Sequence, residues 1–469
     1  MYDRLADAYL LRGWQHMTNV LIHQPTNQVI PCTGREFHLL LLCDGCTDFT
    51  DRLSAEEKQT LEALKAKGYI TSCDTPTPIR KEQQYVLYRN RYVRSAFWSI
   101  TGRCNYHCRH CYMDAPDAQL GEVTHEEAMD FIDQMHRCGI RQVDLTGGEP
   151  FVRKDFWQLV DHMTQCGMAI GMVYTNGWLL TEQVLDAFAK RGQHPEFSIS
   201  FDGVGWHDWM RRVPGAEEAA LRAFDLCKGR GYAVNVEMCL HWGNQSTLRD
   251  TVKLLAAHGV HALKVGRVQD SQLWHANSDG NEMTTEAYCE AAIDYIPHYY
   301  EDGMPMDVLL GGVVMLKRNG DYTVIPERHT NDASCLEHHL CGAVRASCYI
   351  TPEGRLLPCL PMTSWDGQSA FPRIQEEGLQ KLLSAGLYMD MAAAKVKDLL
   401  QANPQCNACE HKYQCGGGCR ASAVCATGDM MGSDPDQCLF YRMNYAPRVR
   451  AAADAAMAKY GVKAERDAT

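Results

Sequence analysis

Three closely spaced cysteines are the first feature of this sequence that could do chemistry. Cys104, Cys108 and Cys111 have the spacing Cys-x3-Cys-x2-Cys. Three thiolates so close together can hold one face of a 4Fe–4S cube, and because such a cube takes four ligands, one iron is left open to another molecule. For these residues alone, a zinc site with His107 or His110 as its fourth ligand is the alternative.

A second group of cysteines lies toward the carboxyl end of the chain. Its seven members and one glycine follow a single spacing pattern: Cys341, Gly354, Cys359, Cys406-x2-Cys409-x5-Cys415-x3-Cys419 and Cys438. Seven thiols exceed one zinc site, such as a zinc ribbon, and approach the eight that two 4Fe–4S clusters need. Cys335 would be the eighth ligand, and Cys348 is the alternative to it.

Short polar motifs follow three strand-like runs. They are Thr146-Gly147-Gly148-Glu149-Pro150, Thr175-Asn176-Gly177, and Ser200 with Asp202 in SISFDG. Each alone is an ordinary turn. Two adjacent glycines also let a ligand approach the backbone closely, and all three motifs fall on the same rim of one predicted sheet. We therefore interpret them together as a binding site.

A regular alternation of strands and helices carries these motifs. Strands are expected at 95–101, 142–147, 169–175, 197–201, 233–240 and 262–266. Amphipathic helices separate most of them, including 125–138, which a capping box of Thr124 and Glu127 opens, and 155–166. Six such repeats predict a parallel sheet, open or curled into a partial barrel, with ligands at the carboxyl ends of its strands.

Residues 1–73 are expected to form a small separate unit. Strands near 17–23 and 27–32 precede two helices, each opened by a capping box, Thr33 with Glu36 and Ser54 with Glu57. This order is typical of a winged-helix-like module. The other expected segments are a proline-containing, basic linker (74–94), the barrel (95–325), the cysteine-rich region (326–445) and a terminal helix with a tail (446–469).

Composition excludes several functional classes. The net charge of −12 and the pI near 5.9 argue against nucleic-acid binding and against binding to an anionic membrane. No apolar run is long enough to span a membrane, and no secretory signal is visible at the start. The 22 cysteines are spread over 469 residues, too sparse for a disulfide scaffold. We expect a cytoplasmic protein that uses cysteines as metal ligands.

The Cys104-x3-Cys108-x2-Cys111 motif and Gly-Gly-Glu-Pro after the second strand resemble the signature of radical SAM enzymes. The resemblance implies a partial (β/α)6 barrel whose open iron binds S-adenosylmethionine. Gly147, Gly148 and Glu149 would hold its methionine end, and His110 occupies a position that is usually aromatic. The residues implied near its ribose and adenine are Asn176, Ser200, Asp202 and Arg267.

The later cysteines resemble the SPASM extension of these enzymes, which implies two auxiliary 4Fe–4S clusters and thus three clusters in all. The first would be held by Cys335, Cys341, Cys359 and Cys419. The second would be held by Cys406, Cys409, Cys415 and Cys438. Cys425 is expected to be a packed thiol.

The N-terminal unit resembles the recognition domain of enzymes that mature ribosomally made peptides. In that family a leader peptide adds to the small sheet as a strand, and here 27–32 and 54–67 would flank the groove. The whole then implies a peptide maturase that removes a hydrogen with a 5′-deoxyadenosyl radical and forms a thioether or carbon–carbon crosslink. A flavodoxin or ferredoxin would supply electrons.

Other functions stay open at this point. Peptide epimerisation needs a hydrogen donor, for which Cys227, Cys239 and Cys289 cannot be ranked from sequence. A sulfatase-maturing type of dehydrogenase usually carries an acid where Leu360 stands. Maturation of a peptide-derived cofactor uses the same architecture. Outside enzymes, a zinc or iron–sulfur protein of regulation or electron transfer is the alternative.

Overall fold

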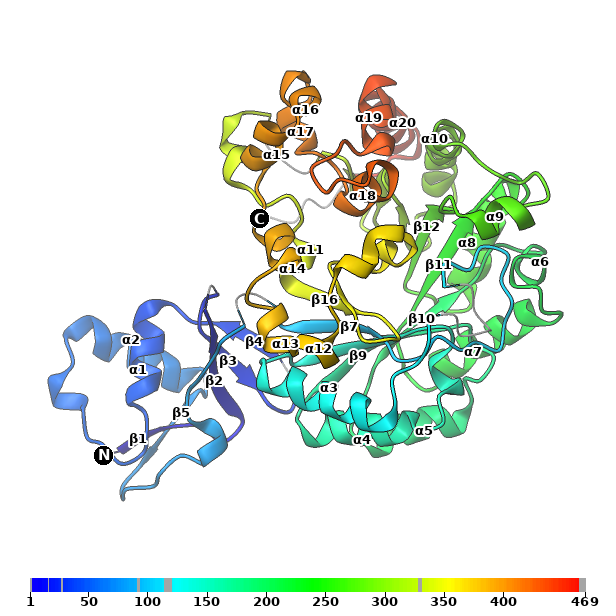
Figure 1. Cartoon of the computed structure of the whole chain (residues 1–469). Coiled ribbons are helices and arrows are strands. Elements are labelled where there is room, and N and C mark those ends of the chain that lie inside the picture. Colours follow the sequence, from blue (N-terminus) through cyan, green and yellow to red (C-terminus); the bar gives the residue numbers. More distant parts are fainter. Residues whose placement is uncertain are drawn as a thin grey trace.

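The computed structural model describes residues 2–15, 17–26, 28–90, 93–113, 120–327 and 331–463. A small N-terminal β unit lies at one side of a large, curved sheet, and the helical, cysteine-rich C-terminal region covers one end of that sheet (Figure 1). This is the predicted α/β partial barrel with an additional unit at each end of the chain. No described helix has the length and apolar character that crossing a membrane requires.

The N-terminal unit contains a four-stranded sheet and two helices. The sheet order is β4-β3-β2-β6, and a separate pair joins β1 to β5 in antiparallel fashion. Its elements are β1 (Tyr2–Leu5), β2 (Tyr9–Trp14), β3 (Val20–His23), β4 (Gln28–Pro31), α1 (Gly34–Leu42), α2 (Ala55–Ala66), β5 (Ile70–Cys73) and β6 (Val86–Tyr88). Both predicted capping boxes are present, because Thr33 and Ser54 accept from the backbone N–H groups of Glu36 and Glu57.

The large sheet contains all six predicted strands, which lie side by side in chain order. Its order is β15-β14-β13-β12-β11-β10-β9-β8-β7-β16-β17. The predicted six are β7 (Ser95–Ser99), β8 (Gln142–Thr146), β9 (Ala169–Thr175), β10 (Glu196–Ser200), β11 (Val234–Leu240) and β12 (Ala262–Arg267), all mutually parallel. The added strands are β13 (Asp307–Leu310), β14 (Val314–Leu316), β15 (Tyr322–Val324), β16 (Ser347–Ile350) and β17 (Leu356–Leu357).

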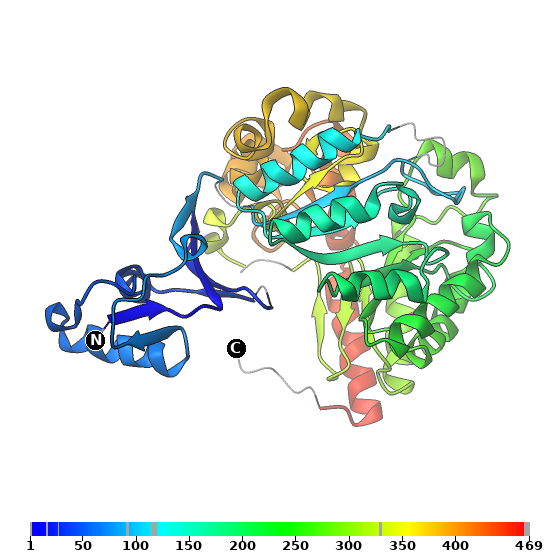
Figure 2. The ribbon, with the colours of Figure 1, turned by 90° about the horizontal axis from the view of Figure 1, so that it is seen from below.

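Helices cover the outer face of this sheet, and shorter helices follow it. Those of the barrel are α3 (His125–Arg137), α4 (Phe156–Gln165), α5 (Glu182–Lys190), α6 (His207–Arg211), α7 (Ala216–Gly229), α8 (Leu248–Ala257), α9 (Gln272–Asn277) and α10 (Thr285–Glu301). The C-terminal ones are α11 (Ala343–Ala346), α12 (Ile374–Glu377), α13 (Leu379–Leu382), α14 (Leu387–Ala393), α15 (Val396–Ala402), α16 (Pro404–Ala408), α17 (Lys412–Cys415), α18 (Arg420–Thr427), α19 (Pro435–Arg442) and α20 (Tyr445–Tyr460). Figure 2 shows the predicted terminal helix α20 in red, beside the edge of the sheet.

The two faces of the sheet differ in chemistry. Val143, Val236 and Val265 are buried in the core beneath the helices. The alternating positions carry polar side chains on the concave face, where Glu237 and Lys264 are 43% and 59% exposed and form an ion pair of 2.7 Å between Oε1 and Nζ. Charged, accessible side chains in central strands indicate an open space inside the partial barrel.

Two expected domain boundaries cut through sheets. β6 lies in the segment expected to be a linker, yet it pairs in parallel with β2 of the N-terminal unit. β16 lies in the cysteine-rich region, yet it pairs in parallel with β7 of the barrel. Both strands are short and become strands through pairing with residues far away in sequence, which a local pattern does not reveal.

Candidate functional site

The loop that follows β7 holds the first three cysteines, and all three are half-buried. The N–H of Tyr106 donates to Sγ of Cys104 at 3.4 Å, and the N–H of Cys111 donates to the carbonyl of Cys108 at 3.3 Å. Burial, with smaller contributions from Glu149, Cys108 and Cys111, raises the pKa of Cys104 to about 12, although the hydrogen bond from Tyr106 opposes that shift. Three thiolates in one place repel one another, so they need a cation nearby in order to ionise together. A cationic iron–sulfur cluster would supply that charge and favour the thiolate form. None of the 22 cysteines forms a disulfide.

Gly147 and Gly148 give the cysteine loop room to approach β8. The N–H groups of Gly148 and Glu149 donate to the carbonyls of Thr101 and Arg103, both at 2.9 Å. A Cβ on Gly147 would lie 2.3 Å from the Thr101 oxygen, and one on Gly148 would lie 2.1 Å from the Arg103 oxygen. The two glycines therefore serve a close approach of backbone to backbone, whereas the sequence suggested only the approach of a ligand.

Glu149 is fully buried and ties two strand ends together. Its carboxylate accepts from the Thr175 hydroxyl and the Asn176 N–H, each at 2.9 Å, and from the Phe151 N–H at 3.2 Å. Burial raises its pKa to about 7, although these hydrogen bonds oppose that shift. The Asn176 side chain in turn donates to Oδ1 of Asn105 at 2.8 Å. Glu149 and Asn176 thus both bind the cysteine loop, Glu149 through its backbone N–H and Asn176 through its side chain.

Asp202 lies in a buried charge network that includes Arg211 and His207, two residues that the sequence did not indicate. Nε of Arg211 donates to its carboxylate at 2.7 Å, and the backbone N–H of Cys239 donates at 3.1 Å. Burial opposes ionisation of Asp202, but Arg211 and the hydrogen bond of His207 outweigh it and hold its pKa far below the usual range. Nη1 of Arg211 also reaches Sγ of Cys108 at 3.7 Å. Asp202 therefore acts through Arg211 on the cysteine loop.

His110 faces the same network. Potential ligand atoms of His110, Asp202 and Cys239 all lie within 4.8 Å of one another. Burial and the nearby Arg211 lower the pKa of His110 to about 3, and its Nδ1 has no hydrogen-bond partner among the described residues. A neutral imidazole whose buried Nδ1 has no partner among the described residues is able to receive a polar group of a ligand.

The remaining two sites lie at the ends of other strands. Ser200 is half-buried at the end of β10. Arg267 ends β12 and donates to both carboxylate oxygens of Asp270 at 3.0 Å. All eight residues predicted to hold the cofactor therefore lie on the cysteine loop or at the carboxyl rim of the sheet. Their individual contacts with a cofactor stay predictions.

The C-terminal cysteines fall into two groups. Cys406, Cys409, Cys415 and Cys438 line one cavity of about 100 Å³, as expected of four ligands to one cluster. In the other group, Cys341 and Cys359 pack against the main core, and burial, Cys419 and Cys341 raise the pKa of Cys359. The structure therefore brings together seven of the eight predicted auxiliary ligands, in one set of four and one set of three. The eighth, Cys335, lies apart from the set of three.

Cys335, predicted as the eighth auxiliary ligand, is buried in a separate apolar cluster with Leu340 and Leu399. Cys348 lies within β16 and donates to the Ser95 carbonyl at 3.8 Å, inside the large sheet. Cys425, expected to be a packed thiol, is exposed on α18 and donates to the Pro361 carbonyl at 3.8 Å, two residues beyond Cys359. The role of Cys335 stays a prediction.

Comparison with known proteins agrees with this geometry. A family model described as the radical SAM superfamily matches residues 98–255. The AdoMet-dependent heme synthase of Methanosarcina barkeri is 25% identical over 356 residues, which cover 72% of this chain and 94% of that protein. The mycofactocin maturase MftC of Mycobacterium tuberculosis is 26% identical over 343 residues, which cover 72% and 81%.

Solved structures share the fold over longer stretches. SuiB of Streptococcus suis, bound to the precursor peptide SuiA, matches with a TM-score of 0.65 and 12% identity, over 93% of this chain and 99% of that one. The enzyme anSMEcpe with bound AdoMet matches with a TM-score of 0.56 and 15% identity, over 77% and 99%. At these identities the likeness concerns the fold.

Proposed function

Because this chain is a radical SAM enzyme related to SPASM-type peptide maturases and to heme synthases, we propose that it modifies a ribosomally made precursor peptide. The observation that carries this proposal is the N-terminal β unit. The likeness to SuiB, whose structure contains a precursor peptide, extends over 93% of the chain and so includes that unit. The match to the heme synthase covers 72% of the chain.

In this proposal Cys104, Cys108 and Cys111 hold the cluster that binds S-adenosylmethionine. When bound and reduced, the cluster supplies one-electron cleavage of that molecule to methionine and a 5′-deoxyadenosyl radical, which removes a substrate hydrogen. Gly147 and Gly148 are proposed to offer their carbonyls to the methionine amino group, since the N–H of Gly148 already donates to the Thr101 carbonyl of the cysteine loop. His110, Asn176, Ser200 and Arg267 are the proposed polar contacts of the remainder, while Glu149 and Asp202 hold the surrounding loops.

The concave face of the sheet is the proposed place for the peptide. Phe97 and Tyr174 lie there with ring centroids 4.9 Å apart, and the Tyr349 hydroxyl is 2.8 Å from Oγ of Ser99. The partly exposed rings of Phe97 and Tyr174 form an apolar wall beside the charged pair of Glu237 and Lys264, and the buried ring of Tyr349 packs against Phe97. A side chain held there would lie between the cysteine loop and the C-terminal cysteines.

Crosslink formation is the proposed outcome of the reaction. Abstracting one hydrogen and joining two groups leaves an electron and a proton to remove. In the proposal Cys341, Cys359, Cys419 and Cys335 would hold one auxiliary 4Fe–4S cluster, and Cys406, Cys409, Cys415 and Cys438 would hold a second. Such clusters would supply an acceptor for the electron. The described cavity among the latter four thiols supports this assignment.

Epimerisation is the second candidate, and one observation favours it. Of the three thiols that sequence left unranked, Cys227 and Cys289 are buried in the helical layer, whereas Cys239 is only partly buried and lies at the carboxyl end of β11. Burial raises the pKa of Cys239 to about 12, so that it keeps its hydrogen at neutral pH. It is the thiol best placed to return a hydrogen atom to a substrate radical. The sulfur radical that this leaves would regain its thiol by taking one electron from the electron donor and one proton from solvent.

The leader peptide is proposed to bind to the N-terminal sheet at β4. β4 is an edge strand with exposed ends, so its outer side is able to accept another strand. The opposite edge, β6, faces a groove of about 760 Å³ between the N-terminal unit and the ends of α3 and α4. Replacing Val29 with Pro on β4 should weaken leader binding, because the Val29 N–H points away from β3 toward the open edge, and Leu87→Pro on β6 is the matched control.

The decisive experiment is reconstitution with the peptide encoded beside this gene. Anaerobic enzyme, S-adenosylmethionine, dithionite and that peptide should yield 5′-deoxyadenosine and a peptide lighter by two hydrogens, as crosslinking requires. A peptide of unchanged mass that gains deuterium in D2O, and loses this gain in Cys239→Ala but not in Cys227→Ala, would favour epimerisation. If 5′-deoxyadenosine forms with no change in any peptide residue, peptide modification is the wrong function.

A further inference from the structure

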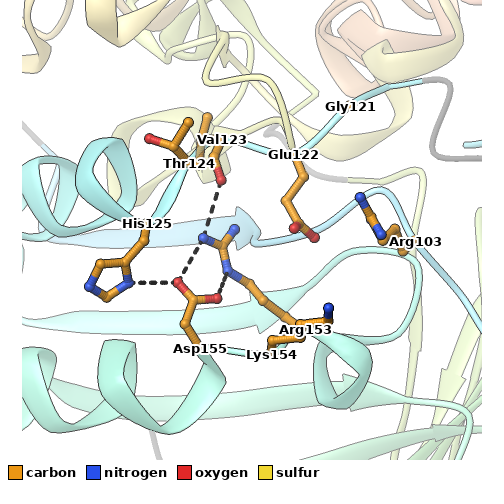
Figure 3. A pocket seen from close by; sticks show the side chains of 9 residues that line it. All are labelled: Arg103, Gly121, Glu122, Val123, Thr124, His125, Arg153, Lys154 and Asp155. Carbon is orange, nitrogen blue, oxygen red and sulfur yellow. Dashed lines mark hydrogen bonds and ion pairs between the residues drawn. The ribbon is translucent and has the colours of Figure 1, made fainter.

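A charged pocket lies on the outer side of the cysteine loop. It has a volume of about 370 Å³ and nine lining residues, which are Arg103, Gly121, Glu122, Val123, Thr124, His125, Arg153, Lys154 and Asp155 (Figure 3). Arg103 immediately precedes Cys104, and Gly102 donates to the Gly121 carbonyl at 3.1 Å. The wall of the pocket is therefore the backbone that begins the cysteine loop.

The floor of the pocket is rigid and its charges are satisfied. Arg153 is buried, pairs with Asp155 at 2.8 Å and donates to the carbonyl of Ile100 at the end of β7. His125 also contacts Asp155, with Nδ1 2.8 Å from its carboxylate. Figure 3 shows this group at one end of the pocket, away from Arg103. The hydrogen-bonded group of Arg153, Asp155 and His125 therefore holds the pocket floor rigid beneath the charged side chains of the rim.

The rim carries free positive charge. The side chains of Arg103 and Lys154 are exposed, and neither forms an ion pair within the described residues. Glu122 is the lining acid outside the Arg153–Asp155 pair. The pocket thus presents two open cations against one acid, on a chain whose net charge is −12. An acidic partner would be repelled by most of this molecule and drawn to such a place.

We propose that this pocket is the docking surface for an acidic, low-potential electron-transfer protein of the flavodoxin class. Only an electron crosses: the donor is oxidised by one electron, and the cluster held by Cys104, Cys108 and Cys111 is reduced by one. Arg103 places the docking surface one residue from the first of these ligands. The inference rests on the proposed function only insofar as the chain holds that cluster, and not on the peptide substrate.

The test compares a protein donor with a chemical one. The probe is a purified bacterial flavodoxin of net negative charge, and the variant is Lys154→Glu, with Lys154→Arg as the conservative rescue. The matched control is Lys190→Glu, an exposed lysine at the C-terminal end of α5. The readouts are flavodoxin affinity and the rate of 5′-deoxyadenosine formation without any peptide, driven by reduced flavodoxin or by dithionite.

We expect Lys154→Glu to weaken flavodoxin binding and to slow the flavodoxin-driven rate about tenfold at low salt. The dithionite-driven rate should be unchanged, Lys154→Arg should match the wild type, and the difference should disappear near 1 M salt, where the Debye length is about 3 Å. Arg103→Gln should weaken flavodoxin binding as well.

Three results would overturn the docking proposal. The first is an equal flavodoxin-driven rate in the wild type and in Lys154→Glu. The second is an equal loss of rate in Lys154→Glu and in Lys190→Glu. The third is inorganic phosphate that binds in the pocket without weakening the binding of flavodoxin. A wild-type protein that forms no 5′-deoxyadenosine even with dithionite would instead refute the radical chemistry itself. The two failures are therefore distinguishable.

Discussion

Replacing Gly148 with alanine should displace the cysteine loop. The backbone of Gly148 is not in the left-handed region, so alanine itself causes no torsional strain there. Its Cβ, however, would lie 2.1 Å from the carbonyl oxygen of Arg103 and 3.0 Å from Cβ of Cys104. Because ordinary contact begins at 3.4 Å, the loop must move by about 1.3 Å. Neither neighbour is the flexible end of a side chain, so the loop cannot yield locally.

A displacement of this size should reduce 5′-deoxyadenosine formation by roughly 100-fold, the usual cost of misplacing a reacting group by 1 Å. Purified Gly148→Ala should also hold fewer irons per chain than the wild type, because the displaced thiols hold their cluster less firmly. The control is Gly229→Ala at the end of α7, where a Cβ meets no atom within 4 Å. Wild-type iron content together with a wild-type rate in Gly148→Ala would refute the close-approach argument.

Three further predictions follow from buried groups. Arg211→Ala leaves the Asp202 carboxylate buried without its partner and should lower the free energy of unfolding by about 3–5 kcal/mol, measured with urea; a change below about 1 kcal/mol would contradict the network. The folded cluster-free protein keeps the Glu149 proton to about pH 7, while an unfolded chain releases it near 4.5, so the folded state loses relative stability as the pH rises through that interval. Glu149→Gln should therefore show a flatter decline in melting temperature between pH 5 and 8, and equal slopes would refute the raised pKa. Cys438→Ser should lose about four irons because its thiol shares a cavity with three others, whereas Cys348→Ser, with its thiol inside the sheet, should keep the wild-type count.

Much of the fold could be predicted because its signals are local. The strands β7 to β12 are short apolar runs bounded by turns, and the helices that begin after Thr33, Ser54 and Thr124 are opened by capping boxes that span only four residues. Cysteine spacing is local in the same sense. β6 and β16 escaped prediction because their pairing partners lie about 70 and 250 residues away, and nothing in three or four residues specifies such a partner.

The site shows the same division. The sequence placed Gly148 and Glu149 at the rim of the sheet but did not reveal their contact with the cysteine loop, since only the structure shows that their N–H groups donate to it. Arg211 carried no signal, because its importance arises from Asp202 and Cys108 meeting it in space. Cys239 could not be ranked against other thiols until its exposure at a strand end was known.

The two proposals place the reductant and the peptide on opposite sides of the cysteine loop. The pocket of Arg103 and Lys154 opens on its outer side, whereas Glu237 and Lys264 face the hollow of the barrel. This separation has a chemical reason. A carbon radical beside a strong reductant would be quenched before it could form a bond, so the electron must enter through the cluster and not through the substrate cavity. The close packing of Gly147 and Gly148 against the loop keeps protein between the two sides. A substitution that loosens this packing should therefore raise the fraction of S-adenosylmethionine cleaved without product, even in molecules that keep their cluster.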